Sequence, residues 1–309
     1  QELANYRREH QHLSVFVVTP QEIYNEFSSG SQDPVAIRDY MKMIYDKSGG
    51  TQPQYLLLVG RPSYDYRGIE GSCKLYVPNF QCNSIINNDA FKANDDFFGL
   101  LDNDEGNNAA GRTIDIAVGR FPVSTAAQAQ TAVDKTINYA SAAILGANTQ
   151  SCNFGDWKNI ATFVGGDENY NAPVNTADAA AQIAAVENED LNIEKIYLDA
   201  YQQVTYSSSA RYPEVTTDIN NRMNKGCLLF TYVGHGGKAG WAHERIIELT
   251  DINRWENKYN QPWMFTMTCE FAWCDRSLVS PAELVFLNTH GGAVGMVSTM
   301  RVAFTGGND

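Results

Sequence analysis

The chain has 309 residues, of which 43% are hydrophobic and 19% charged, and its formal net charge at pH 7 is −13. Such a composition is typical of a globular protein with a substantial core. The acidic balance argues against nucleic-acid binding, because affinity for phosphate depends on Lys and Arg. The sequence also contains no apolar run of about 18 residues, which argues against a membrane span.

Apolar runs bounded by turn-forming residues predict strands along the whole chain, and helix-like stretches fall between many of them. The predicted strands are Leu13–Thr19, Tyr55–Val59, Ile114–Val118, Ile160–Val164, Ile193–Leu198, Leu228–Val233, Met264–Thr268 and Ala293–Ser298. The predicted helices are Asp33–Asp46, Thr125–Ala143, Thr176–Glu187, Pro213–Met223, Thr250–Trp255 and Ser280–Asn288. Strands that alternate with helices indicate an α/β fold with a mainly parallel sheet.

The polar, turn-rich stretch Gly146–Asp156 is the best candidate for a domain boundary. It predicts an N-terminal α/β lobe over residues 1–148 and a C-terminal α/β lobe over residues 149–309, each near the usual domain size. The alternative is that both are lobes of one continuous sheet. The first residue is Gln1 and the last is Asp309, soon after an apolar run, so we expect a fragment of a longer precursor.

Two apolar runs end at a side chain that can react. Cys227–Gly237 (CLLFTYVGHGG) ends at His235, and Trp263–Phe271 (WMFTMTCEF) ends at Cys269. Short apolar runs between turn formers are typical of buried strands in a parallel sheet. Ligands of open α/β sheets bind beyond the carboxyl ends of the strands. The sequence therefore predicts that Cys269 and His235 meet there as a thiol nucleophile and its base.

A third strand end carries an acid, since Ile160–Val164 is followed by two glycines and then by Asp167 and Glu168. A catalytic base needs a group that orients it. Asp167 is our candidate for that role, with a turn or helix-cap Asp as the alternative. Three strand ends that carry Asp, His and Cys are stronger evidence together than any of them alone.

The glycines beside His235 allow the backbone to approach a ligand closely and to expose its N–H groups. The N–H group of Gly236 or Gly237, together with that of Cys269, is therefore a candidate for an oxyanion hole.

Three further residues are candidates for a substrate cleft: Trp241, Glu270 and Arg301. A Trp is more often a core residue than part of a cleft. Arg301 could bind a substrate carboxylate, or it could pair with an internal acid such as Glu270 or Asp275.

An acidic cluster and a cysteine pair carry weaker hypotheses. The stretch Asn94–Glu105 contains Asp95, Asp96, Asp102 and Asp104, which could supply oxygen ligands to a structural Ca²⁺ ion or could simply form a solvated loop. Cys73 and Cys82 flank a loop-like stretch and could form a disulfide in an oxidising compartment. The sequence has no CxxC pair, so a zinc site is not expected.

Several strings of this sequence resemble one family. In the C-terminal half they are GHGG–W–E–LTDI (Gly234–Ile252), TCEF–D–S–AE (Thr268–Glu283) and GGAVGMVSTMR (Gly291–Arg301). In the N-terminal half they are NEFSSG (Asn25–Gly30), DPVAIRDYMKMIY (Asp33–Tyr45), YLLLVGRPSYDYR (Tyr55–Arg67), DDFFGLLD (Asp95–Asp102) and VGRFP (Val118–Pro122). Together they are similar to the gingipain-type cysteine peptidases, relatives of the caspases, and within these to the surface sortases of type IX secretion in Bacteroidota.

The resemblance implies two caspase-like lobes, with Cys269 as nucleophile, His235 as general base, Asp167 as the orienting acid and Gly236 with Cys269 as the oxyanion hole. It implies chemistry without a required cofactor, and a structural Ca²⁺ ion in some relatives. For the sortases it implies secreted cargo proteins with a C-terminal signal domain, an amine on anionic lipopolysaccharide as acceptor, other outer-membrane components of the secretion system as partners, and a location at the cell surface. An ordinary secreted protease and a catalytically silent or latent scaffold domain are the alternatives.

Overall fold

The computed structural model describes residues 1–49, 52–65, 67–69, 76–83, 91–105, 113–144, 155–207 and 209–302. The chain forms two compact units. The first contains Gln1–Val133 and Cys274–Ser277, and the second contains Asp134–Trp273 and Leu278–Ala303. The boundary predicted after residue 148 lies among residues 145–154, outside the described part of the chain, so it stays a prediction.

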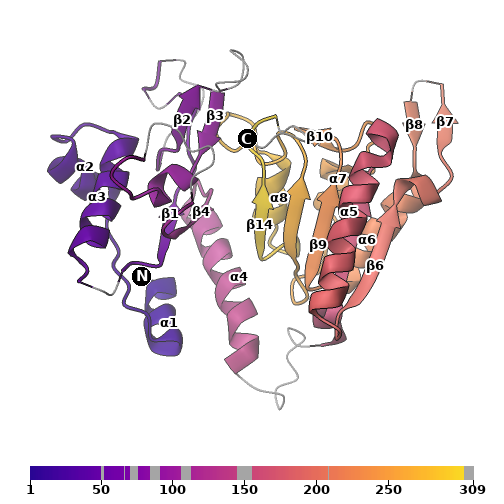
Figure 1. Ribbon diagram of the computed structural model, residues 1–309, viewed down its shortest axis with the longest axis horizontal. Helices are drawn as coiled ribbons and strands as arrows, with labels where there is room; N and C mark the ends of the chain where they lie inside the picture. The colour runs from indigo at the N-terminus through magenta and orange to yellow at the C-terminus, as the bar shows by residue number, and fades with distance from the viewer. Residues whose placement is uncertain are drawn as a thin grey trace. The chain divides into compact units, whose positions relative to one another are not determined.

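The first unit has a small parallel sheet and several helices (Figure 1). Its elements are α1 (Glu2–Gln11), α2 (Pro20–Phe27), α3 (Pro34–Lys47), β1 (Tyr55–Val59), β2 (Phe80–Asn83), β3 (Phe91–Asn94), the 3-10 helix η1 (Asp96–Gly99), β4 (Ala117–Phe121) and the first part of α4 (Ala126–Ile144). Strand β1 pairs in parallel with β4, and β2 pairs antiparallel with β3. Helix α3 begins as the sequence predicts, because the Asp33 carboxylate accepts a hydrogen bond from the N–H of Val35 and Pro34 opens the first turn.

A buried ion pair organises the strand ends of this first unit. The Arg120 guanidinium binds both carboxylate oxygens of Asp95, at 2.6 and 2.7 Å. It also donates to the carbonyl oxygens of Gly60, Val77 and Pro78, at 2.8 to 2.9 Å. Because five hydrogen bonds converge on one guanidinium, the arginine of the VGRFP string is a structural residue.

The second unit contains a five-stranded parallel sheet in the order β14-β13-β9-β5-β6 (Figure 1). Its strands are β5 (Ile160–Gly165), β6 (Asn192–Tyr197), β9 (Leu229–Val233), β13 (Trp263–Met267) and β14 (Gly295–Ser298). Its helices are α5 (Glu168–Glu187), α6 (Pro213–Lys225), α7 (Leu249–Ile252) and α8 (Pro281–Leu287), with the 3-10 helices η2 (Asp156–Asn159) and η3 (Leu198–Ala200). Five short strands make up two small antiparallel sheets: β7 (Val204–Tyr206), β8 (Ser209–Arg211), β10 (Gly236–Gly237), β11 (Gly240–Trp241) and β12 (Ile247–Glu248).

Helices cover both faces of the large sheet. Along β5, Ala161 and Phe163 pack with Ala181 of α5, whereas Val164 packs with Val215 and other residues of α6 in the main core. Successive side chains of a strand point to opposite faces, so α5 and α6 lie on opposite sides of the sheet (Figure 1). The result is the α/β fold with helix-flanked parallel strands that the alternating pattern predicts.

Several elements depart from the sequence prediction, including helices α1 and α2, which were not predicted. Residues 13–19 contain no strand among the described residues, because this apolar run has no partner strand to complete its backbone hydrogen bonds. The strand predicted at Ile114–Val118 lies three residues later, at β4. Helix α5 begins at Glu168 and not at Thr176, and its first turn contains a left-handed stretch, Asn169–Asn171, that sequence periodicity does not reveal.

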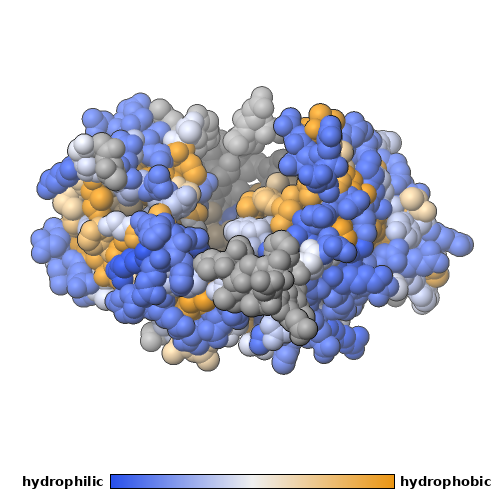
Figure 2. Space-filling model, turned by 90° about the horizontal axis from the view of Figure 1, so that it is seen from below, coloured by the Kyte–Doolittle hydropathy of each residue, from blue (hydrophilic) through white to orange (hydrophobic). Residues whose placement is uncertain are grey.

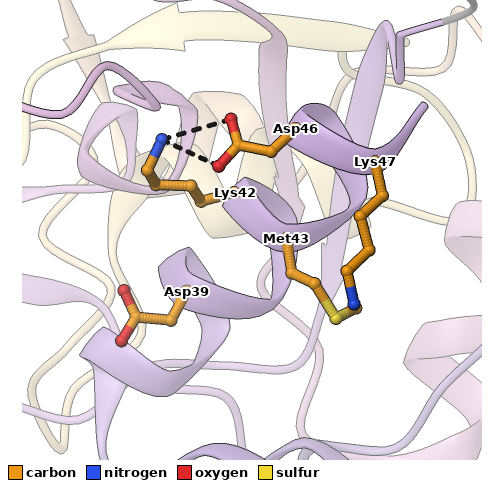
Figure 3. A pocket seen from close by; sticks show the side chains of 5 residues that line it. All are labelled: Asp39, Lys42, Met43, Asp46 and Lys47. Carbon is orange, nitrogen blue, oxygen red and sulfur yellow. Dashed lines mark hydrogen bonds and ion pairs between the residues drawn. The ribbon is translucent and has the colours of Figure 1, made fainter. Parts of the chain in front are cut away.

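Hydrophilic side chains dominate the face shown in Figure 2, with smaller apolar patches between them. A shallow depression is lined by five residues of α3, where Lys42 pairs with Asp46 at 3.1 Å (Figure 3). Among the helices of the described residues, none is both long enough and apolar enough for a bilayer crossing. The Cys73–Cys82 hypothesis stays a prediction because Cys73 lies outside the described residues.

Candidate active site

The three strand ends singled out in the sequence lie side by side. Strand β9 is the middle one, with β13 on one side and β5 on the other. Val233 of β9 pairs in register with Met267 of β13. His235 and Cys269 each lie two residues beyond that pair, on adjacent parallel strands. The tertiary structure therefore carries both residues to the same edge of the sheet.

The pairing continues past the strand ends. The N–H of Gly234 donates to the carbonyl of Met267 at 3.3 Å, and the N–H of Gly166 donates to the carbonyl of Val233 at 2.9 Å. Asp167 and Glu168 follow Gly166 directly, so the third strand end also reaches this edge.

Two hydrogen bonds restrain the backbone of His235. Its carbonyl accepts hydrogen bonds from the hydroxyl of Tyr232, at 2.5 Å, and from the N–H of Ala242, at 2.7 Å. Tyr232 is fully buried and stacks on Trp241, with ring centroids 4.5 Å apart. A side chain at Gly234 would collide with the Tyr232 hydroxyl, 2.6 Å from the position of a Cβ atom. This support restricts the loop that presents the imidazole.

Trp241 thereby corrects one sequence prediction. Its side chain is wholly buried among Phe230, Tyr232 and Phe271. It packs beneath the His235 loop and does not line an exposed cleft. The sequence could not separate the two interpretations, because an indole suits both a core and a cleft wall.

Gly236 brings the His loop against the Cys loop. A Cβ atom at Gly236 would overlap the hydroxyl of Thr268, the residue that precedes Cys269. In the hairpin of β10 and β11, the Ala242 N–H bonds to the His235 carbonyl, and Gly236 is the next residue in the ladder, opposite Trp241. Hydrogen-bonded and non-hydrogen-bonded pairs alternate in antiparallel ladders. The Gly236 N–H therefore points away from β11, as an oxyanion donor requires.

The loop after Cys269 is fixed to the segment that follows β14. The N–H of Glu270 donates to the carbonyl of Arg301 at 3.1 Å, and the N–H of Ala272 donates to that of Thr299 at 2.9 Å. The Thr299 hydroxyl bonds to the Thr268 carbonyl. Glu270 has a left-handed backbone, with φ at 50°. Cys269 itself is half-buried and is not in a disulfide.

A lysine bridges the two loops. The ammonium of Lys238, at the tip of the β10–β11 hairpin, lies 3.2 Å from the centre of the Trp273 ring and 3.9 Å from a carboxylate oxygen of Glu270. A cation over an indole face is attracted by the negative face of the ring. Glu270 and Arg301 are thus near Cys269 in the structure, and their role in a substrate cleft stays a prediction.

The two acids after β5 have different surroundings. Asp167, our sequence candidate, accepts a hydrogen bond from the Tyr212 hydroxyl at 2.5 Å. Both carboxylate oxygens of Glu168 are buried, and neither has a hydrogen-bond partner among the described residues. Burial raises the pKa of Glu168, an effect that its own backbone N–H and His235 oppose and that Glu244 and Asp167 reinforce.

Glu168 is a site residue that the sequence reasoning missed. A side chain at Gly166 would overlap its carboxylate, so this glycine makes room for it. The order Gly-Gly-Asp-Glu shows that acids follow β5, but it does not show which one turns towards the histidine. Asn169 was missed as well: its side-chain nitrogen lies 3.2 Å from Nε2 of His235. Asn tolerates left-handed backbone, which was the one weak signal for such a position.

The acidic cluster lies elsewhere, in the first unit. Asp95 is neutralised by Arg120, and burial together with Asp95 raises the pKa of Asp96. Asp102 contributes its carbonyl to Arg38 at 3.1 Å. Within the described ranges, no group of three or more His, Cys, Asp or Glu side chains is arranged to hold a metal ion. The Ca²⁺ hypothesis stays a prediction.

The fold and the site together define a class. The helix-flanked parallel sheet matches the caspase-like fold of the gingipains. The family model of peptidase family C25 matches residues 1–309, and the chain belongs to that family.

Solved structures agree on the fold. The Arg-specific cysteine proteinase gingipain R (RgpB) has a TM-score of 0.70 at 17% identity, covering 98% of this chain and 60% of its own. A complex of Porphyromonas gingivalis RgpB pro- and mature domains has a TM-score of 0.68 at 17% identity, covering 97% of this chain and 60% of that one. This chain thus spans about 60% of the length of these structures.

A third structure overlaps only in part. Dimeric latent PorU from Porphyromonas gingivalis is 32% identical over 54% of this chain and 18% of its own, with a TM-score of 0.40. No match was found among curated proteins.

Proposed function

We propose that this chain is the catalytic part of a cysteine endopeptidase and transpeptidase in which Cys269 is the nucleophile and His235 the general base. The observation that carries the proposal is the register of β9 and β13, since both residues lie two positions beyond the paired Val233 and Met267. A thiol and an imidazole at adjacent strand ends form the pair that nucleophilic catalysis needs.

The reaction follows from these positions. His235 takes the thiol proton, and the Cys269 sulfur attacks the peptide carbonyl carbon to form a C–S bond. The N–H groups of Gly236 and Cys269 stabilise the oxyanion. The C–N bond then breaks, and the amine leaves with the proton from His235. Water or a second amine attacks the thioester, His235 takes the proton of the attacking group, and the sulfur leaves.

The similarity of the sequence strings to type IX sortases supports the amine as acceptor. On this proposal the enzyme cuts the C-terminal signal domain from secreted cargo and transfers the cargo to an amine on anionic lipopolysaccharide. It works at the cell surface, with other outer-membrane components of the secretion system as partners. The competing function, a secreted gingipain-like protease, uses the same site with water as acceptor.

A thiol-reactive probe tests the nucleophile. The protein and its His235→Ala variant are treated with iodoacetamide, and the modified cysteines are mapped by mass spectrometry. We expect Cys269 to react fastest in the wild type and to lose that advantage in the variant. Cys227 is an internal control, because burial raises the pKa of its thiol to about 12. Equal labelling of several cysteines, indifferent to His235, would contradict the proposal.

The acceptor is tested separately. A cargo peptide that spans the cleavage site is incubated with the enzyme and a biotinylated alkylamine, and the products are separated by mass. A cargo–amine conjugate supports the sortase, whereas hydrolysed cargo alone supports the protease. Labelling of Cys269 without either product would support a latent domain.

A further inference from the structure

The start of α5 has an unusual backbone. Asn169, Tyr170 and Asn171 all lie in the left-handed region, with φ of 53°, 58° and 62°. Left-handed residues other than glycine are normally isolated, because the Cβ atom approaches the following carbonyl oxygen. The side chain of Tyr170 is fully exposed, so its packing does not compensate for the conformation. Strained segments of this kind occur where the surrounding structure needs a side chain in a particular place.

The segment places two asparagine side chains on different partners. The Asn169 side-chain nitrogen lies 3.2 Å from His235 Nε2, and that of Asn171 lies 3.2 Å from a carboxylate oxygen of Asp199. Within the part of the chain that the structure describes, the contact with Asn169 is the hydrogen bond that the His235 ring makes. Asn171 thus has the same left-handed backbone conformation as Asn169, but its side chain does not contact His235.

A catalytic imidazole needs this kind of contact. The ring nitrogen that takes the thiol proton must be unprotonated, so the proton of the neutral ring must sit on the other nitrogen. Which nitrogen carries it is set by the hydrogen bond that the other one makes. A buried carboxylate has this task in serine proteases, and an asparagine has it in papain-like enzymes.

Neither neighbouring acid occupies this position. Asp167 bonds to the Tyr212 hydroxyl, and the Glu168 carboxylate makes no hydrogen bond to the ring. The amide of Asn169 is in contact with Nε2, and its oxygen and nitrogen exchange places by a half-turn of the side chain. It can therefore present an acceptor to an Nε2–H group.

We propose that Asn169 is a positioning residue for His235: its amide oxygen accepts the Nε2–H, which leaves Nδ1 to take the proton of Cys269. The inference rests on the proposed function, because it assigns a role within the same site. It also explains why a strained turn stands at the end of β5: an ordinary helical start would direct residue 169 elsewhere.

Glycine substitutions separate the side chain from the backbone. Asn169→Gly keeps a residue suited to the left-handed region and removes only the amide, whereas Asn171→Gly makes the same change at a position without a contact to His235. We expect the rate of Cys269 alkylation by iodoacetamide near neutral pH to fall on the order of 10–100-fold in the first variant. In the second it should stay within about twofold of the wild type, at the size usual for changes away from the reacting groups. Equal changes in both variants would overturn the proposal.

The tautomer provides a readout that does not depend on activity. Long-range ¹H–¹⁵N NMR spectra of the ¹⁵N-labelled protein show which ring nitrogen of His235 carries the proton. We expect the Nε2–H tautomer in the wild type and in Asn171→Gly, and a mixture in Asn169→Gly. A wild-type ring protonated at Nδ1, or a tautomer unchanged in Asn169→Gly, would overturn the inference.

A third variant tests rescue. Asn169→Asp keeps an acceptor for Nε2–H, so it should retain the Nε2–H tautomer and recover most of the alkylation rate. Failure to recover either the tautomer or the rate counts against the positioning role. If wild-type Cys269 is no more reactive than the other thiols, the proposed function fails, while the tautomer measurement still decides the role of Asn169.

Discussion

Each of the two units has a cluster of charged groups at its strand ends. The two clusters differ in how completely their polar groups are paired by hydrogen bonds. In the first unit, Arg120 makes five hydrogen bonds, two to Asp95 and three to carbonyl oxygens. In the second unit, Glu168 is buried without a hydrogen-bond partner among the described residues, and left-handed residues stand beside it.

The contrast indicates which cluster stabilises the fold and which one is a candidate for catalysis. Buried polar groups are almost always hydrogen-bonded, because a buried group without a partner loses its contacts with water and gains none in the protein. A cluster that keeps an unpaired acid beside strained backbone needs another explanation, and a reactive site supplies one.

Removing the proposed nucleophile should separate activity from stability most clearly. We expect Cys269→Ala to lower peptide cleavage on the order of 10³-fold or more, because no other group can form the thioester. Urea unfolding should be unchanged within about 0.5 kcal/mol. Cys227→Ala is the matched control: it removes a fully buried thiol, should cost about 1–2 kcal/mol through the cavity, and should leave cleavage intact. Cleavage that survives in Cys269→Ala would exclude this residue as the nucleophile.

Disrupting the hydrogen bonds of Arg120 in the first unit should instead lower stability. Arg120→Met leaves the Asp95 carboxylate and three carbonyls without their donor, and we expect the free energy of unfolding to fall by about 3–5 kcal/mol. Lys195→Met is the control, because the pair with Asp178 is partly exposed and such pairs contribute about 0–1 kcal/mol. Denaturant titration of the three proteins measures both effects. Equal losses in the two variants would remove the distinction between a buried network and a surface pair.

Neutralising the buried carboxylate of Glu168 should raise stability and lower activity. We expect Glu168→Gln to raise the free energy of unfolding at pH 7 by about 1 kcal/mol, because it removes the cost of a buried charge, and to lower peptide cleavage.

The sign of the pH dependence follows from the raised pKa. The Glu168 pKa in the folded protein lies above the unfolded value of 4.5. Its contribution to stability is therefore fully present below about pH 4.5 and is lost as the pH rises through the folded pKa. The gain from Glu168→Gln should accordingly shrink in acid, and a gain that is independent of pH would contradict this account.

A second buried cation sharpens the comparison with Arg120. The ammonium of Lys135 binds the carbonyl oxygens of Val285, Phe286 and Gly291 near the C-terminal end of α8. It has acceptors but no counter-charge in these contacts, and burial lowers its pKa from 10.5 to about 7.

The contribution of Lys135 to stability should therefore change with pH in the opposite direction to that of Glu168. A lysine with a lowered folded pKa contributes stability that is fully present above pH 10.5 and is lost as the pH falls through about 7. We expect wild-type stability to rise with pH between about 7 and 10.5, and Lys135→Met to flatten the rise. Thermal unfolding at a series of pH values measures it, and identical slopes in both proteins would refute the assignment.

Much of the architecture could be predicted from the sequence because it depends on local patterns. Strand β1 falls on the predicted residues, and β5, β6, β9 and β13 lie within one or two residues of prediction. Leu13–Thr19 failed because an apolar run becomes a strand only when another strand pairs with it. Trp241 was misplaced because burial is decided by neighbours that are distant in the sequence.

The sequence by itself determined the family, the α/β fold class and the candidates His235 and Cys269, because strand ends, glycines and motif strings are written in consecutive residues. Tertiary packing places β9 between β5 and β13, and it buries the Glu168 carboxylate without a hydrogen-bond partner among the described residues. It also decided that Asn169 contacts the imidazole. Strand order and left-handed backbone depend on packing across the whole sheet, and no local pattern encodes them.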